Sequence, residues 1–356
     1  MPLGMNYSLF RKKVIDWYAW NARTLPWRGT ADPYRIWVSE IMLQQTTTQT
    51  VSGYFDRFVE RFPTVLELAA ASLDEVNRLW EGLGYYRRAA QLHFAARKIV
   101  DNHDGEFPLD VATVRNLPGI GRYTAGAILS IATDQRLPIL EANTLRLHAR
   151  LLAIKGDTSC GEANRTLWDF AEKILPKTGC GRFNQALMDL GNLVCTSKEP
   201  HCAQCPVIKF CESAKRGLQA SIPSPKPKKR AEERTEVAVM IRKKGKILLV
   251  KYPPDVRWAG LWDFPRCEYN DDNLSLQRRL SEITGREIII GKKIETLKHS
   301  VTRFRITLRF HEAKELGKVP GVALPYETKW AAEHEMEHIP LNSTARKLWK
   351  HWCKTK

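Results

Sequence analysis

Residues 195–211 read CTSKEPHCAQCPVIKFC and place four cysteines in one short loop, at C-x6-C-x2-C-x5-C spacing. Thiolates this close in sequence can converge on one metal centre, and iron–sulfur clusters are held by four such thiolates, often with a proline after a ligand. Structural zinc sites more often combine two C-x2-C pairs, or cysteine with histidine. We therefore expect Cys195, Cys202, Cys205 and Cys211 to hold a [4Fe-4S] cluster. Zinc or unrelated thiols are the alternatives.

The composition favours a polyanionic partner. The chain has 356 residues, enough for two or three domains, and a formal charge of +17. Nucleic acid is the first candidate for the partner, a membrane surface is the second, and a generally basic surface is the third reading. No apolar run is long enough to cross a membrane, and the first residues lack the apolar core of a signal peptide. We expect reduced thiols and a cytoplasmic, nucleoid-associated protein.

The pattern of apolar residues divides the chain into two halves. Residues 8–217 show helical spacing, with amphipathic runs at 36–50, 51–62, 73–80 and 89–100. A Pro- and Lys-rich stretch follows, and after it come alternating strand-like segments at 236–241, 246–250, 288–290 and 304–310, with helices expected at 273–283 and 343–352. The sequence predicts an all-α domain over 1–220, a linker over 221–235 and an α+β domain over 236–356.

A glycine-containing turn in the helical half is typical of DNA binding. Residues 117–128 read LPGIGRYTAGAI and resemble the hairpin of a helix–hairpin–helix element. Gly119 and Gly121 permit a tight turn, and the helix that follows the turn would offer free N–H groups to a phosphate. We expect DNA contacts from both glycines, Arg122 and Thr124, and the alternative is a plain turn between two structural helices.

Three further stretches carry a family resemblance: LPWR at 25–28, WVSEIMLQQT at 37–46 and GLGYY at 82–86. With the hairpin and the cysteine loop, they resemble the iron–sulfur helix–hairpin–helix DNA glycosylases, and among these the adenine DNA glycosylase family. The resemblance implies a monomeric enzyme on double-stranded DNA that removes adenine mispaired with 8-oxoguanine in base excision repair. It also implies DNA contacts from Arg28, Gln44, Gln45 and Tyr85, with Gln45 and Tyr85 as wedges that replace an everted nucleotide.

The chain departs from the endonuclease III branch of the same superfamily at one position. After Arg122 that branch has a lysine, whose amine forms a Schiff base and leads to strand cleavage. Here the residue is Tyr123, which cannot form an imine. We therefore expect a monofunctional glycosylase. A bifunctional lyase and a mismatch-binding protein without catalysis are the alternatives.

The chemistry of adenine removal asks for two carboxyl groups. One acid must protonate the base, and one carboxylate must face the cationic sugar, as in glycoside hydrolysis. The resemblance assigns the acid to Glu40. In the run PILEAN at 138–143, Glu141 stands where the family has aspartate, and Ala142 stands where it has glycine. We expect Glu141 to take the aspartate's role, and a slow enzyme is the alternative. We expect Tyr123 and Asn143 to hydrogen-bond around this carboxylate and the flipped nucleotide.

Residues 236–352 resemble the Nudix-like domain with which this family inspects the opposite strand. A working Nudix hydrolase holds a divalent metal with several glutamates on one helix, but here Arg279 and Ile283 occupy two of three acidic positions. We therefore expect no Nudix metal. The hairpin that reads 8-oxoguanine matches His299 to Arg303, where we expect contacts from His299, Thr302 and Arg303. A plain exposed hairpin, or affinity through phosphates alone, is the alternative.

Overall fold

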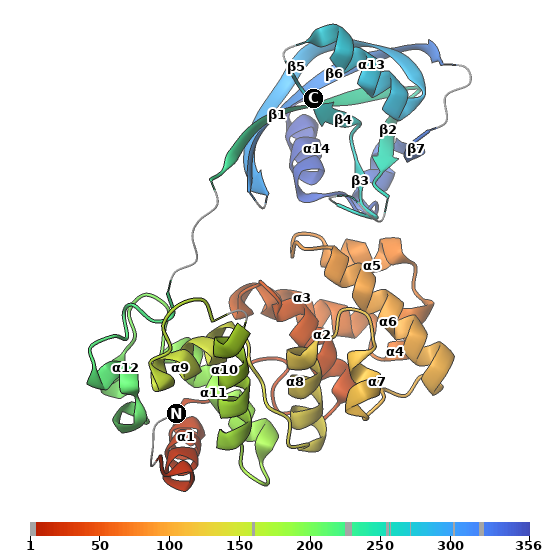
Figure 1. Ribbon diagram of the computed structural model, residues 1–356. Helices are drawn as coiled ribbons and strands as arrows, with labels where there is room; N and C mark the ends of the chain where they lie inside the picture. The colour runs from red at the N-terminus through yellow and green to blue at the C-terminus, as the bar shows by residue number, and fades with distance from the viewer. Residues whose placement is uncertain are drawn as a thin grey trace. The chain divides into compact units, whose positions relative to one another are not determined.

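The structure is a computed structural model that describes residues 5–158, 161–224, 230–253, 256, 258–270, 272–301, 303–319 and 324–356. It divides into two compact units: residues 1–69 with 94–227, and residues 70–93 with 228–356. The first unit is helical and the second contains the sheet (Figure 1). No helix in the described ranges is long and apolar enough to cross a membrane.

The helical half follows the sequence prediction closely. Its core gathers the apolar faces of α1, α9, α10 and α11 around Phe10, Phe170 and Phe183. Its helices are α1 (Tyr7–Asn21), α2 (Pro33–Leu43), α3 (Thr48–Arg61), α4 (Val65–Ala70), α5 (Leu73–Trp80), α6 (Arg87–His103), α7 (Val111–Arg115), α8 (Arg122–Thr133), α9 (Ala142–Leu152), α10 (Gly161–Ile174), α11 (Cys180–Leu193) and α12 (Glu212–Lys215), with short 3-10 turns at Cys202–Gln204 and Ile208–Phe210.

One expected helix, over residues 36–50, is wrong in its extent. Helix α2 ends at Leu43, and α3 begins at Thr48 after Thr47 caps its N-terminus. Between them Gln45 has a backbone φ of 59°, in the left-handed region that non-glycine residues rarely adopt. The apolar pattern runs on through this break, so periodicity alone did not show it. The break turns the segment 44–47 toward the candidate site described below.

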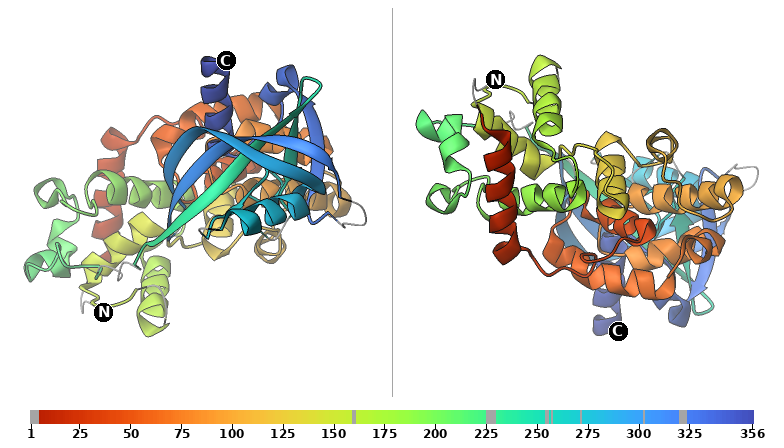
Figure 2. Two further views of the ribbon diagram at one scale, coloured as in Figure 1. Left: turned by 90° about the horizontal axis from the view of Figure 1, so that it is seen from above. Right: turned by 90° about the horizontal axis from the view of Figure 1, so that it is seen from below.

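The second unit holds a mixed seven-stranded sheet, which confirms the α+β prediction. Its central strand β1 (Glu232–Lys243) runs parallel to β6 (Phe304–Lys318), and β6 pairs antiparallel with β5 (Arg286–Val301). These three long strands lie side by side in Figure 2. The remaining strands are β2 (Lys246–Lys251), β3 (Trp262–Asp263), β4 (Arg266–Glu268) and β7 (Glu327–Ala332).

A helix covers each face of this sheet (Figure 1). Helix α14 (Ser343–Thr355) packs Leu348 and Trp349 against Phe264 and Phe310, while α13 (Asn273–Thr284) packs Leu276 and Leu280 on the other face. A 3-10 turn at Glu333–Glu337 precedes α14. Strand β1 begins at Glu232, so the last four residues of the expected linker are strand. Within the expected linker, residues 225–229 lie outside the described ranges.

Candidate active site and cysteine loop

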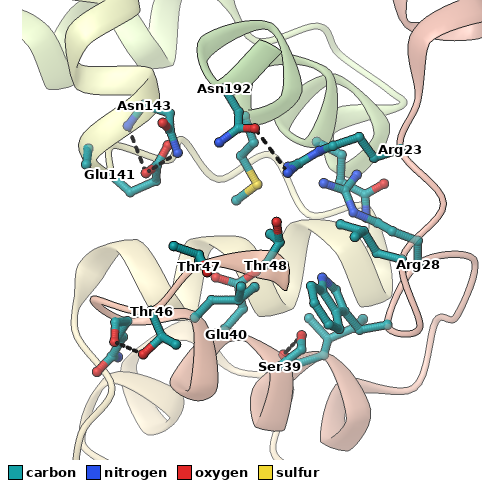
Figure 3. Close-up of a pocket in the computed structure, with 18 of the residues that line it drawn as sticks. Arg23, Arg28, Ser39, Glu40, Thr46, Thr47, Thr48, Glu141, Asn143 and Asn192 are labelled. Carbon is teal, nitrogen blue, oxygen red and sulfur yellow. Dashed lines mark hydrogen bonds between the residues drawn. The ribbon is translucent and has the colours of Figure 1, made fainter. Parts of the chain in front are cut away.

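A cavity of about 670 Å³ opens in the helical unit, a size typical of ligand sites. The end of α2, the turn after it, the starts of α8 and α9, and α11 supply its walls (Figure 3). Seven residues that the sequence analysis singled out line this one cavity, although they come from five segments: Arg28, Glu40, Gln44, Gln45, Tyr123, Glu141 and Asn143.

Glu40 is the buried acid of this cavity, with 5% of its surface exposed. It lies on α2 between apolar neighbours, and Tyr123 donates a hydrogen bond of 2.6 Å to its Oε2, where the sequence analysis expected this hydroxyl at Glu141. Burial raises the pKa of Glu40 to about 7, although the Tyr123 hydroxyl and the Arg28 charge oppose the rise. Burial also keeps Tyr123 neutral, because it raises the pKa of that phenol well above its usual range. Glu40 is therefore protonated in a large share of the molecules near neutral pH, and it can give this proton to a base.

Glu141 occupies the N-terminus of α9 as its capping residue. Its Oε2 accepts from the backbone N–H and the side-chain amide of Asn143, at 2.8 and 3.1 Å, and its Oε1 accepts from the N–H of Thr144 at 2.9 Å. Burial raises its pKa, and these three donors favour the charged form. The longer side chain of glutamate thus still reaches the cavity wall, and the helix end stabilises its negative charge.

An ion cluster on the opposite wall includes a residue that the sequence analysis missed. Asp189 on α11 is fully buried and binds Arg23 at 2.6 Å and Arg28 at 3.2 Å. The Arg28 guanidinium also donates to the Tyr18 hydroxyl at 2.7 Å. Arg28 is thus held in the cavity wall by protein partners. A lone acid in the otherwise apolar run 186–190 was the available signal, because a buried carboxylate needs a cation beside it.

Gln185 and Asn192 are two further polar lining residues that the sequence analysis did not identify. Both lie on α11, where Gln185 accepts from Tyr18 at 3.2 Å and Asn192 accepts from Arg23 at 3.3 Å. An amide offers donors and acceptors together, which suits the edge of a purine. Gln185, Asp189 and Asn192 follow one another at intervals of four and three residues, so they lie on the same face of α11.

The glycine hairpin has the predicted geometry. Gly119 has a φ of 80°, and Gly121 precedes α8 without any side-chain hydrogen bond to the helix end. The first N–H groups of α8 are therefore free of a side-chain cap, as a phosphate site requires. Arg122 lies with its guanidinium 3.8 Å from the ring centre of Trp168. The side chain of Thr124 is buried, so its DNA contact stays a prediction that rests on its backbone N–H.

The four loop cysteines line one small cavity beside α9. Among the residues that the structure describes, no three His, Cys, Asp or Glu side chains form a group that could hold a metal ion. Four thiols on one small cavity with an apolar surround nevertheless match the donor set of an iron–sulfur cluster. The buried guanidinium of Arg150 donates to the Cys195 carbonyl and Sγ, both at 3.3 Å, and so holds the first cysteine of the loop in place. The residues present therefore fit such a cluster.

Arg146 joins the cysteine loop to the catalytic cavity. Its guanidinium donates to the Cys195 carbonyl at 2.7 Å and to the side-chain oxygen of Asn143 at 2.9 Å. Asn143 in turn donates to Glu141. Gly191 allows this approach of α11 to α9, because a Cβ there would lie 2.8 Å from the Asn143 carbonyl oxygen. A chain of direct contacts thus runs from the first cysteine to the carboxylate.

Comparison with known proteins agrees with this geometry. Residues 38–173 match the family described as HhH-GPD superfamily base excision DNA repair protein, and residues 236–351 match the NUDIX domain. Adenine DNA glycosylase of Homo sapiens is 30% identical over 96% of this chain and 74% of its own length. The Rattus norvegicus protein of that name is 36% identical, over 96% and 78%. The chain belongs to the adenine DNA glycosylase family.

Solved structures support the fold of the helical half of this family member. A thermostable thymine-DNA glycosylase shares 27% identity with a TM-score of 0.54, over 59% of this chain and 97% of that one. A non-covalent Endonuclease III–DNA complex aligns with 20% identity and a TM-score of 0.51, over 61% of this chain and all of that one, and shows the fold alone. The predicted glycosylase fold and the Nudix-like C-terminal domain are confirmed.

Four of the expected DNA-contact residues lie in the second unit. Tyr85 is 56% exposed and has a φ of 49°, a strained value for an aromatic residue. His299 lies near Trp258, with ring centres 6.5 Å apart, and Arg303 pairs with Glu232 at 2.9 Å. Thr302 lies outside the described residues. DNA contact by each of the four stays a prediction.

Proposed function

We propose that this chain is a monofunctional glycosylase that hydrolyses the N-glycosidic bond of adenine mispaired with 8-oxoguanine or guanine. The observation that carries the proposal is the pairing of Glu40, protonated near neutral pH, with Glu141 in one cavity. Family membership supports adenine as the base. The target nucleotide must leave the helix to enter this cavity.

In the proposed reaction Glu40 is the general acid. Tyr123 donates to Oε2, so the transferable proton resides on the other carboxyl oxygen, Oε1. Protonation of a ring nitrogen converts adenine from an anionic into a neutral leaving group. A pKa of about 7 leaves the acid protonated in about half of the molecules at pH 7, and a general acid works best when its pKa lies near the operating pH.

Glu141 is the proposed carboxylate that faces the sugar. Departure of the base leaves an oxocarbenium-like ion, and an ionised carboxylate stabilises it or bonds to it transiently. The donors from Asn143 and Thr144 fix its orientation at the helix end. Water then adds to the sugar carbon and its proton returns to solvent or to Glu40, which leaves an abasic site.

The cavity lining argues against lyase chemistry. Its cationic residues within the described part of the chain are Arg23 and Arg28, and no lysine lines it. An arginine guanidinium does not form a Schiff base, and Tyr123 is bonded to Glu40. We therefore propose that the DNA strand stays intact after base removal.

Two further parts of the proposal rest on the family and on the chain's own residues. The four cysteines would hold a [4Fe-4S] cluster, whose thiolate bonds would cross-link the loop 195–211. The C-terminal domain would inspect the base opposite adenine through His299, Thr302 and Arg303. Double-stranded DNA with an adenine mispair is the proposed partner, and the enzyme is proposed to act as a monomer.

Single-turnover excision tests the proposal. Cluster-loaded protein is mixed with duplexes that carry adenine opposite 8-oxoguanine, guanine or thymine. We expect adenine release with the first two, and strand breaks only after alkali. Intact adenine in all duplexes, together with tight binding of the mispair, would support the mismatch-binding alternative. Strand breaks without alkali would support a lyase, and Glu40→Gln serves as the inactive control.

A further inference from the structure

Helix α5 and the turn after it belong to the same compact unit as the C-terminal domain. The contacts within this unit are specific. At the start of α5, Asp74 pairs with Lys251 at 2.8 Å and accepts from the Trp262 indole at 3.3 Å. Further along, Arg78 donates to the Glu337 carbonyl at 2.7 Å. The helix is therefore held to this domain at several points along its length.

The tightest of these contacts lies at the end of α5. Arg346 on α14 donates to both carboxylate oxygens of Glu81, at 2.6 and 3.0 Å. Each side chain is only 9% exposed, so this bidentate pair is desolvated. The remaining donors of Arg346 bind the carbonyls of Met336 and Ile339, which fixes the guanidinium in its own domain. Glu81 is thus paired with a guanidinium that is fixed to the C-terminal domain.

The turn that follows Glu81 is stiff. Its backbone is left-handed at Gly82, Gly84 and Tyr85. The Trp80 indole and the Arg88 guanidinium both donate to the Gly84 carbonyl, each at 3.1 Å. The guanidinium of Arg88 also lies 5.4 Å from the ring centre of Tyr85. Because these contacts hold the turn 82–84, a displacement of residue 81 would also displace Tyr85.

We infer that the Glu81–Arg346 ion pair couples the C-terminal domain to the turn that presents Tyr85, so that this domain sets the position of the wedge. The inference rests on the proposed function, because it takes Tyr85 as the side chain that enters the DNA stack. Glu81 and Arg346 are then positioning residues. When the C-terminal domain engages the base opposite adenine, the force reaches Tyr85 through four residues of backbone.

Hydrogen exchange of the full-length protein without DNA tests the coupling. The amides of Gly82, Leu83 and Arg88 bond to the Tyr86 hydroxyl and to the carbonyls of Trp80 and Tyr85. We expect Glu81→Gln to raise their exchange rates about tenfold through local opening of the turn. Arg346→Gln should do the same.

The controls separate coupling from general damage. Lys251→Gln breaks the ion pair at the other end of α5 and should leave exchange at the turn unchanged. Amides of α9 and α11 should be unaffected in every variant. If Arg346→Gln unfolds its own domain, Glu81→Gln decides, because it leaves every C-terminal residue in place. Unchanged exchange at the turn in Glu81→Gln would overturn the inference.

A second measurement asks whether the pair acts through Tyr85. Glu81→Gln should slow single-turnover adenine excision several-fold in the parent protein and have little effect in a Tyr85→Ala background. An equal effect in both backgrounds would overturn the coupling to the wedge. The exchange data do not need a working glycosylase, so a failure of the proposed function would be recognised separately.

Discussion

Replacement of Tyr123 by phenylalanine gives a sharp test of the acid. The Tyr123 hydroxyl donates to Glu40 and lowers its pKa, so its removal should raise that pKa above about 7. A hydrogen bond to a charged group contributes about 1.5–3 kcal/mol, and one pKa unit corresponds to about 1.4 kcal/mol. The expected shift is therefore about 1–2 pH units upward.

The assay is the pH dependence of single-turnover excision. An acid must be protonated to act, so the rate of the parent should fall about tenfold per pH unit above its pKa of about 7. In Tyr123→Phe this fall should begin near pH 8 or above, even if the maximal rate is lower. At pH 8 the variant would retain about half or more of its own maximum, whereas the parent would retain about one tenth.

Tyr34→Phe provides the matched control. Tyr34 is also buried, but its hydroxyl donates to the Phe62 backbone carbonyl and not to a carboxyl group. Its removal should leave the pH at which the rate falls unchanged. A Tyr123→Phe profile that stays in place or moves to lower pH would refute the assignment of Glu40 as the acid, since the Tyr123 hydrogen bond lowers its pKa more than any other group does.

Three further predictions concern stability and geometry. Burial raises the pKa of Glu40 in the folded protein from its ordinary 4.5 to about 7. The contribution of Glu40 to folding stability is therefore fully present below pH 4.5 and is lost as the pH rises through about 7. Glu40→Gln should therefore gain up to about 3 kcal/mol relative to the parent above pH 7, and thermal unfolding that shows no pH-dependent gain would contradict this. Asp189→Asn leaves two arginines without their carboxylate and should cost about 3–5 kcal/mol in urea unfolding; a loss under about 1 would show that solvent compensates. Gly191→Ala forces a Cβ against Asn143 and should reduce excision, whereas Gly53→Ala, with open space around it, should be neutral or stabilising. Equal rates in these two variants would argue against the close approach of α11 to the site.

The sequence predicted the acid but not its surroundings. Glu40 was identifiable because a carboxyl group in an apolar run with a family signature has few structural explanations. Asp189 carried no such signature, and its importance depends on Arg23 and Arg28, which lie far from it in sequence. Partners separated by about 160 residues cannot be paired by spacing, because their contact depends on how α11 packs against the N-terminal segment.

The helical and mixed halves, the hairpin and the cysteine loop follow from the sequence alone. Each of these depends on local periodicity, on glycine and proline, or on ligands close together in the chain. Tertiary structure decided the rest: the pKa of Glu40, the anchoring of Glu141 at a helix end, and the pairing of Glu81 with Arg346. These depend on burial and on contacts between distant segments, and such contacts exist only once the chain has packed.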